Sequence, residues 1–145
     1  MTASVAELIQ RLEAATGPNY ALEIDIFKFA NPKYDEYVEG RGGLVHPSDG
    51  EDQRVLSNVR PSNYTASIDT ALRLLEWLLP DWSGVVDFGK ESPLRRADIY
   101  GPVKEMGEDE YGAPVEVRDF SWGEAPTPAL ALCIAIFKAV QEQQA

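Results

Sequence analysis

One segment near the C-terminal end restricts the fold more than any other, because it is apolar around a whole helical circumference. Residues 129–137 have the sequence ALALCIAIF, and the first charged residue after them is Lys138. Thr127 and Pro128 are typical of a helix start, since threonine caps the first turn and proline needs no N–H there. A helix without a polar face is normally buried on all sides. We therefore expect this helix, with Cys133 inside it, to form the centre of the fold or of a subunit interface.

Composition and charge limit the class of protein. The chain has 145 residues, of which 44% are hydrophobic, so it can build one core and is not disordered as a whole. Its single cysteine excludes an intramolecular disulfide framework and a cysteine-rich metal site. The net charge of −11 argues against direct binding to DNA or RNA backbones. The sequence contains no 18-residue apolar run and no visible signal peptide, so we expect a cytoplasmic protein with no membrane partner.

Two more helices are indicated by their caps and apolar spacing. Residues 4–7 have the spacing of a capping box, and residues 17–18 (Gly-Pro) end the amphipathic run that follows. Thr65 or Ser67 opens a second amphipathic run, which Pro80 stops. Both runs repeat their apolar residues at helical spacing, so each is expected to bury one face.

Other segments are less sharply determined. The apolar positions of residues 20–30 alternate as in a strand and also line one face of a helix, and so short a run does not decide between the two. Residues 31–63 are rich in glycine and proline and predict a long irregular region within a single domain of residues 1–145. Residues 84–88, 96–100 and 115–120 have strand composition and predict an antiparallel meander with one covered face.

The search for catalytic groups is largely negative. No metalloprotease, P-loop or nucleophile-elbow motif is present. His46, the only histidine, lies in the irregular region, and Cys133 is expected to be an inert buried thiol. The acidic run at residues 108–110 is more typical of a solvated turn than of a metal site. We expect no catalytic residue, no metal and no cofactor, with a carboxylate-assisted hydrolase as the enzymatic alternative.

The charge distribution indicates one candidate binding site. Residues 105–125 hold seven acidic and one basic side chain, whereas residues 90–104 hold four basic and two acidic ones and include Arg95 and Arg96. Two interpretations stay open for this pair: ion pairs with neighbouring carboxylates, or an anion site, since arginine offers a planar fork to carboxylate and phosphate groups.

Three other residues complete the candidate ligand site. Tyr100 and Trp122 are aromatic residues near the expected strands and could stack on a base, although core packing explains them as well. Thr65 lies near a helix start, where backbone N–H groups can bind an anion or simply be capped. The candidate ligand-binding set is therefore Arg95, Arg96, Tyr100, Trp122 and Thr65.

Three stretches resemble the phage ABA-sandwich domain family. They are residues 64–72 (YTASIDTAL) and 127–135 (TPALALCIA), which are similar to its two signature segments, and residues 8–18 (LIQRLEAATGP), which are similar to its usual start. The resemblance implies an α+β protein, a three-layer α/β/α sandwich with a small, mainly antiparallel sheet and a buried C-terminal helix. It favours a helix for residues 20–30. It implies phage or prophage origin and transfers no catalytic residue.

Two functions follow as hypotheses. The first is a non-enzymatic phage accessory protein that binds and sequesters a small anionic host-defence signal such as a nucleotide, as a possible homo-oligomer in the cytoplasm of an infected or lysogenic bacterial host. The second is an acidic protein-interaction module that imitates nucleic acid or blocks a basic host protein. The charge total is compatible with both.

Overall fold

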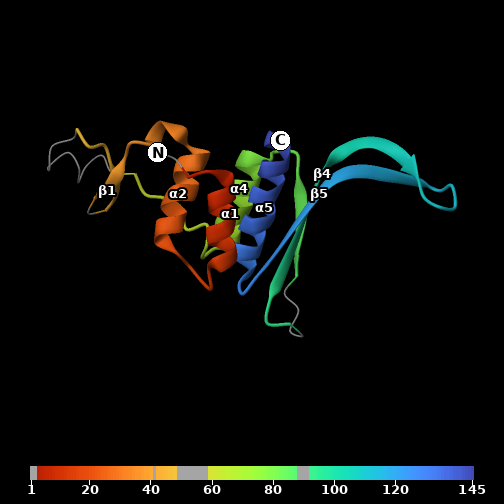
Figure 1. Ribbon diagram of the computed structural model, residues 1–145, viewed down its shortest axis with the longest axis horizontal. Coiled ribbons are helices and arrows are strands. Elements are labelled where there is room, and N and C mark those ends of the chain that lie inside the picture. The colour runs from red at the N-terminus through yellow and green to blue at the C-terminus, as the bar shows by residue number, and fades with distance from the viewer. Residues whose placement is uncertain (1–2, 41, 49–58, 88–91) are drawn as a thin grey trace.

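The protein has a helical body, a sheet against one side of it, and a two-stranded arm that extends beyond the sheet (Figure 1). The computed structural model describes residues 3–40, 42–48, 59–87 and 92–145. Residues 41 and 49–58 of the expected irregular region (31–63) lie outside the described residues. So do residues 88–91, of which residue 88 belongs to the expected strand at 84–88. All statements below concern the described part of the chain.

The C-terminal helix α5 (Pro128–Gln144) lies at the centre of the body (Figure 1). The Oγ1 atom of Thr127 caps its first turn by accepting a hydrogen bond from the N–H of Leu130. Every residue from 129 to 137 is buried, because α5 contacts α1 (Val5–Ala14) and α4 (Ile68–Leu78) as well as the sheet. Of the two predicted roles for this helix, the structure shows the first, since its apolar surface is covered by its own chain.

The sheet has three antiparallel strands in the order β3 (Ser83–Asp87), β4 (Arg95–Glu108) and β5 (Pro114–Ala125). Its face toward α5 carries small residues, including Ala97, Ser121 and Gly123, and this lets the helix approach closely. The Oγ atom of Ser121 donates a hydrogen bond of 2.7 Å to the carbonyl oxygen of Ala135 in α5. The contact between β5 and α5 is therefore made partly by the backbones themselves.

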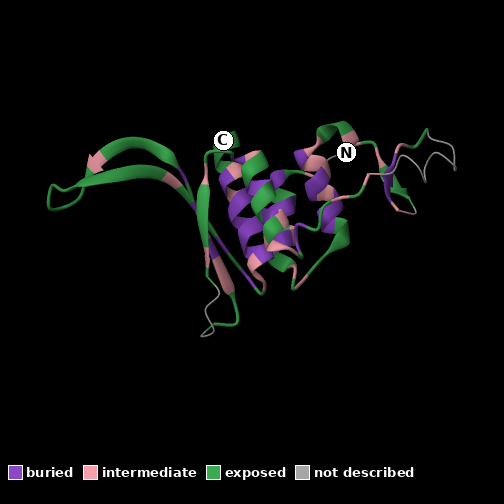
Figure 2. Cartoon of the chain, turned by 180° about the vertical axis from the view of Figure 1, so that it is seen from behind, coloured by how far each residue is buried: buried purple, intermediate pink, exposed green. Residues whose placement is uncertain are grey.

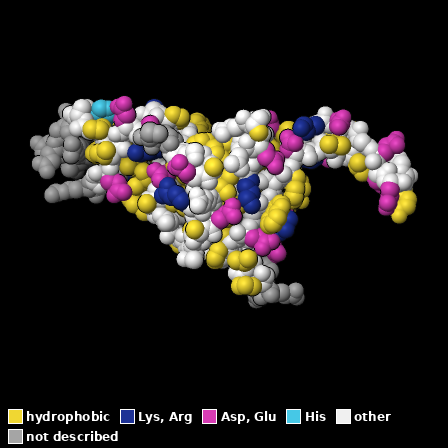
Figure 3. Space-filling view, viewed as in Figure 1, with side chains coloured by type: hydrophobic (Ala, Val, Ile, Leu, Met, Phe, Trp, Pro, Cys, Tyr) yellow, Lys and Arg dark blue, Asp and Glu magenta, His cyan; other side chains and the backbone are white. Residues whose placement is uncertain are grey.

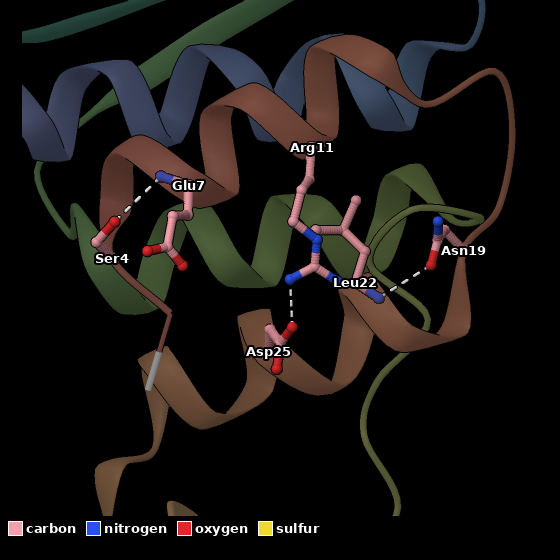
Figure 4. Close-up of polar contacts among 6 residues, drawn as sticks. All are labelled: Ser4, Glu7, Arg11, Asn19, Leu22 and Asp25. Atoms are coloured by element: carbon pink, nitrogen blue, oxygen red, sulfur yellow. Dashed lines mark hydrogen bonds and ion pairs between the residues drawn. The ribbon is translucent and has the colours of Figure 1, made fainter. Parts of the chain in front are cut away.

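Helix α2 (Tyr20–Ala30) packs against α1 and α4 on the side of the body away from the sheet (Figure 1). Residues 20–30 are thus helical, and the strand alternative is excluded. Figure 4 shows how α1 and α2 are fixed: Ser4 and Asn19 cap their first turns, and Arg11 of α1 forms an ion pair with Asp25 of α2. Side-chain oxygens at such caps satisfy backbone N–H groups that the helix leaves without a partner.

The region between α2 and α4 contains short elements rather than a continuous coil. A 3-10 helix (Pro32–Tyr34) is followed by strands β1 (Val38–Gly40) and β2 (Gly43–Val45), which pair antiparallel. Leu44 is buried and forms an isolated bridge with Val59. The region expected to be irregular therefore includes one short antiparallel strand pair.

Strands β4 and β5 are much longer than the sequence indicated. Beyond the body they continue as a hairpin, which we call the arm and define as residues 103–118. The ladder is irregular between Tyr100 and Glu105, where the arm leaves the body. The acidic run at residues 108–110 lies at the tip, where Asp109 Oδ1 accepts hydrogen bonds from the N–H groups of Tyr111 and Ala113. The expected solvated turn is therefore the tip of an extended hairpin.

The α+β class, the antiparallel sheet and the buried C-terminal helix are confirmed. The described helices lie on one face of the three-stranded sheet, while many side chains of the opposite face are exposed (Figure 2). The arm extends toward the side of this uncovered face and away from the helices (Figure 1). In the described ranges, no helix combines the length and the apolar character needed to cross a bilayer.

Candidate functional site

The uncovered face of the sheet, which we call the open face, carries a group of aromatic and apolar side chains. It is defined by the residues that alternate with the buried ones: Val85, Arg96, Asp98, Tyr100, Phe120, Trp122 and Glu124. Side chains alternate between the two faces of a strand, so these residues point away from α5. Trp122 is 40% exposed and Phe120 is 42% exposed, which is unusual for side chains of this size in a folded domain.

Strand pairing sets the order of side chains on the open face. Tyr100 lies opposite Phe120, and their ring centroids are 5.3 Å apart. The next pair along the face is Asp98 and Trp122, followed by Arg96 and Glu124. One end of the face is therefore aromatic and the other end is charged, with Trp122 between them.

Arg96 is balanced by acidic groups on both sides. Its Nε donates to Asp98 Oδ1 at 2.9 Å, and its Nη1 lies 3.7 Å from Glu124 Oε1. Its guanidinium carbon also lies 4.3 Å from the ring centroid of Trp122, with Lys138 Nζ at 5.3 Å from the same ring. Cations above an indole face are attracted by its quadrupole. Arg96 therefore orients Trp122. The two carboxylates beside Arg96 reduce the attraction of its guanidinium group for an anion.

Two of the predicted ligand residues lie outside this group. Arg95 donates through Nη1 to the carbonyl oxygen of Ser92 at 2.8 Å and lies opposite Ala125 in the sheet. Thr65 is fully buried in the body, where its N–H and Oγ1 donate to Glu23 Oε2 at 3.0 and 2.7 Å. The structure thus brings Arg96, Tyr100 and Trp122 together and leaves Arg95 and Thr65 elsewhere. The helix cap near Thr65 is made by Ser67 instead.

The arm carries further exposed apolar side chains on both faces of its hairpin. Its exposed large hydrophobic side chains are Val103, Met106, Tyr111, Val115 and Val117. Strand pairing places Val103 and Met106 on the side of the open face, and Val115 and Val117 on the opposite side. The arm also carries five carboxylates and two cations, and acidic side chains gather along it and at its tip (Figure 3). Arg118 pairs with Glu116 at 2.7 Å, and Lys104 pairs with Asp119 at 3.1 Å. Both cations are thus already neutralised within the chain.

Sequence reasoning missed the apolar side chains of the arm. The available signal was the spacing of Val115 and Val117 together with a glycine-containing turn at residues 109–113, which is typical of a hairpin. The acidic run at residues 108–110 predicted only the turn. The segments before and after it were not predicted to pair as one hairpin. Gly112 has a φ of +80° and suits this turn because it lacks a Cβ.

A second candidate site is a pocket of about 290 Å³ between α2, α4 and residues 62–64. Phe27 and Asn31 come from the end of α2, while Thr70, Arg73 and Trp77 come from one face of α4. Sequence reasoning missed this pocket. The spacing of Thr70, Arg73 and Trp77 at three and four residues was visible and places them on one side of a helix.

The thiol of Cys133 and the imidazole of His46 lie apart from these two candidate sites. Burial raises the pKa of Cys133 to about 12, with a smaller effect from the nearby charge of Glu23, so the thiol stays protonated. His46 Nδ1 lies 2.6 Å from Ser48 Oγ, two residues away, and its ring packs edge-on against Tyr37. Within the described ranges, no group of three or more histidine, cysteine or acidic side chains is placed to hold a metal ion.

Comparison of the chain with protein-family models, with curated proteins and with solved structures found no match. The resemblance to the phage ABA-sandwich family therefore stays a prediction from the sequence. The role of each residue above is accordingly argued from the geometry of this chain alone.

Proposed function

We propose that this protein is a non-enzymatic protein-binding module that docks a partner with a basic surface onto the open face and the arm. The observation that carries the proposal is the large number of exposed apolar side chains there. Nine of the fourteen large hydrophobic side chains that are exposed in the described residues lie on the open face or the arm. Large apolar patches with a polar rim are typical of protein interaction sites.

Charge selects the kind of partner. Glu105, Glu108 and Glu110 have no ion pair in the described part of the chain, and Asp109 beside them caps the turn of the tip. The two cations of the arm are paired within the chain, so its field is negative. A negative surface steers a positively charged partner and repels a second copy of itself. This complementarity favours a basic protein over self-association.

The small-anion hypothesis is weaker for the open face than the sequence indicated. Arg96 already has two carboxylates beside it, so an incoming phosphate group would have to compete with both. The protein-binding function needs no free cation on this face. It uses Trp122, Phe120 and Tyr100 as the apolar centre, since buried aromatic side chains contribute much of the binding free energy in interfaces.

The setting of this function follows the sequence resemblance. A phage or prophage protein in the cytoplasm of a bacterial host would meet many basic proteins that bind nucleic acid. An arm with several carboxylates offers such a protein a negative surface similar to that of a nucleic acid backbone. The proposal therefore includes competition between this chain and nucleic acid for the partner's basic surface.

Site-specific photo-crosslinking in bacterial lysate tests the docking surface. A photoreactive benzoylphenylalanine replaces Met106 in the arm in one sample and Tyr20 on α2 in another, because these side chains are 62% and 50% exposed. We expect an adduct with a basic protein from position 106 that position 20 does not form. The adduct should weaken as salt is raised, because screening shortens the range of the attraction.

Charge-reversal variants complete this test. Glu105→Lys with Glu110→Lys should abolish the adduct, whereas Glu13→Lys with Glu39→Lys changes the total charge equally outside the arm and should preserve it. Purified partner should then bind the wild type and lose affinity for the arm variant. An adduct made only with a second copy of the chain, or the same adducts from both positions, would contradict the proposal.

A further inference from the structure

We propose that the pocket between α2 and α4 binds a small planar ring that carries one anionic group. This site is separate from the open face and the arm, and it takes a different class of ligand from the protein partner proposed above. The pocket of about 290 Å³ is close to the lower end of the range for small-molecule sites, so it suits a single ring system with a small substituent.

The wall formed by Trp77 is held in place before any ligand arrives. Its side chain is 67% exposed, yet its Nε1–H donates a hydrogen bond of 2.9 Å to the carbonyl oxygen of Ala30. That oxygen belongs to the last residue of α2, where carbonyl groups lack partners within the helix. The bond fixes the indole across the end of α2. Phe27, which is largely buried, forms another aromatic part of the lining.

The polar groups around the pocket are also fixed. Asn31 Nδ2 donates to the carbonyl oxygen of Phe27 at 3.0 Å, and Thr70 Oγ1 donates to Asn63 Oδ1 at 2.8 Å. Side chains that are already ordered lose little conformational entropy when a ligand binds. The pocket is therefore preorganised for a small rigid molecule.

Arg73 supplies the charge. Every other arginine in the described ranges has a hydrogen-bond or ion-pair acceptor: Arg11, Arg60, Arg95, Arg96 and Arg118. Arg73 has no such acceptor there, although Asp69 and Glu76 stand about one turn away on the same helix. A cation without a partner in an acidic protein, on the rim of an aromatic pocket, is suited to an anionic ligand.

The ligand class follows from combining these groups. A guanidinium group binds a carboxylate or a phosphate through two parallel N–H donors. Trp77 and Arg73 lie four residues apart on one face of α4, so a ring against the indole places its anionic substituent beside the guanidinium. Carboxylate and phosphate present similar oxygens at this position, and the experiment separates them.

Nuclear magnetic resonance with four matched probes tests the proposal. Benzoate and phenyl phosphate carry both a ring and an anionic group, inorganic phosphate lacks the ring, and benzyl alcohol lacks the charge. The readout is the indole Nε1–H signal of Trp77, assigned by its loss in Trp77→Phe and compared with those of Trp82 and Trp122. We expect the two anionic rings to shift the Trp77 signal selectively and to bind more tightly than the two controls.

Matched arginine variants assign the charge to Arg73. Arg73→Gln should weaken binding of the anionic rings by about tenfold or more, because it removes a charge-assisted hydrogen bond. Arg95→Gln removes the same charge on the sheet and should leave their affinity unchanged. A preference between benzoate and phenyl phosphate would support the proposal and identify the anionic group.

Three results would overturn the proposal. They are no shift of the Trp77 signal by either anionic ring at millimolar concentration, equal binding of inorganic phosphate or benzyl alcohol, and unchanged affinity in folded Arg73→Gln. None of them affects the photo-crosslinking test at position 106, because the pocket and the arm share no residue. The two proposals therefore fail or succeed separately.

Discussion

At the scale of single residues, Gly123 and Ser121 decide how closely the sheet approaches the central helix. A Cβ on Gly123 would lie 2.5 Å from the carbonyl oxygen of Ala131 and 2.8 Å from the Cβ of Ile134. Both atoms belong to α5, and a carbonyl group inside a helix cannot swing away without breaking its hydrogen bond. Glycine is required here by the approach of two backbones.

Gly123→Ala should therefore destabilise the protein. The added methyl group forces β5 and α5 apart, and overpacking of this kind costs about 1–3 kcal/mol. Urea unfolding followed by circular dichroism measures the free energy of unfolding. Gly17→Ala is the matched control, because a Cβ on Gly17 would meet no atom within 4 Å. Equal stabilities of the two variants would show that the contact between sheet and helix is looser than described.

The buried thiol of Cys133 should make stability depend on alkaline pH. Burial raises its pKa to about 12 from the ordinary value of 9.0. In the unfolded chain the Cys133 thiol therefore loses its proton above pH 9, whereas in the folded protein it stays protonated. It follows that the free energy of unfolding falls as pH rises from 9 toward 12, by about 1.4 kcal/mol per pH unit for this group.

Comparison with Cys133→Ala isolates this effect. Other groups titrate in both proteins, so the quantity to measure is the difference between their free energies of unfolding at pH 8 and at pH 10.5 under reducing conditions. The free energy of unfolding of the wild type should fall more than that of the variant between pH 8 and pH 10.5. A difference that stays constant with pH would mean that the thiol reaches solvent in the folded protein.

At the scale of elements, α2 is joined to the segment before α4 by a buried polar contact. The carboxylate of Glu23 accepts two hydrogen bonds from Thr65, whose Oγ1 in turn accepts one of 2.9 Å from the N–H of Asn19. Glu23 is only 7% exposed, so its carboxylate oxygens depend on these donors for hydrogen bonds. Thr65 thus connects two elements that are far apart in the sequence.

Thr65→Val should destabilise the body by about 1–3 kcal/mol. The variant keeps the shape of the side chain and removes the hydroxyl donor to Glu23, which leaves a buried carboxylate with fewer hydrogen bonds. Thr16→Val is a suitable control, because Thr16 is exposed and has no side-chain bond in the described structure. Thermal unfolding of both variants gives the comparison. If Thr65→Val is as stable as the control, the Thr65 hydroxyl does not stabilise the body as we propose.

At the scale of the whole molecule, the body and the arm have separate tasks. The body contains the buried core around α5, whereas the side chains of the arm are almost all exposed (Figure 2). An exposed hairpin contributes little apolar burial to folding. The arm is thus maintained at little benefit to stability, which fits a role in binding.

Replacing the arm, residues 103–118, by a two-residue turn should separate the two tasks. We expect the free energy of unfolding of the shortened chain to stay within about 0.5 kcal/mol of the wild type, since surface changes away from the core have effects of this size. Calorimetry checks the stability, and the shortened chain should no longer bind the purified partner. A large loss of stability would show that the arm contributes to the folding of the body. Retained binding would show that the partner docks on the body and not on the arm.

Particular residues show how far sequence patterns reach. Caps at Ser4, at Thr65 or Ser67, and at Thr127, with the amphipathic or apolar runs after them, predicted three helices, because these signals act between residues a few positions apart. The same local patterns did not reveal the length of β4 and β5, since strand pairing joins residues distant along the chain. Thr65 was judged by its position near a helix start, while its partner Glu23 lies 42 residues away.

Sequence patterns alone predicted several helices, an antiparallel meander and a C-terminal helix that must be covered. Caps, apolar spacing and the run at residues 129–137 sufficed for this, because a helix without a polar face is normally buried on all sides. They left open whether its own chain or a partner subunit covers it. Folding showed that the chain itself covers this helix, and it determined which charged groups of the described residues have acceptors and which side chains lie together. Arg95 and Arg96 stood out in the sequence, but folding gave both of them acceptors and left Arg73 without one in the described residues. The physical reason is that the chemistry of a charged or aromatic side chain depends on its neighbours in space, and those neighbours come from distant parts of the chain.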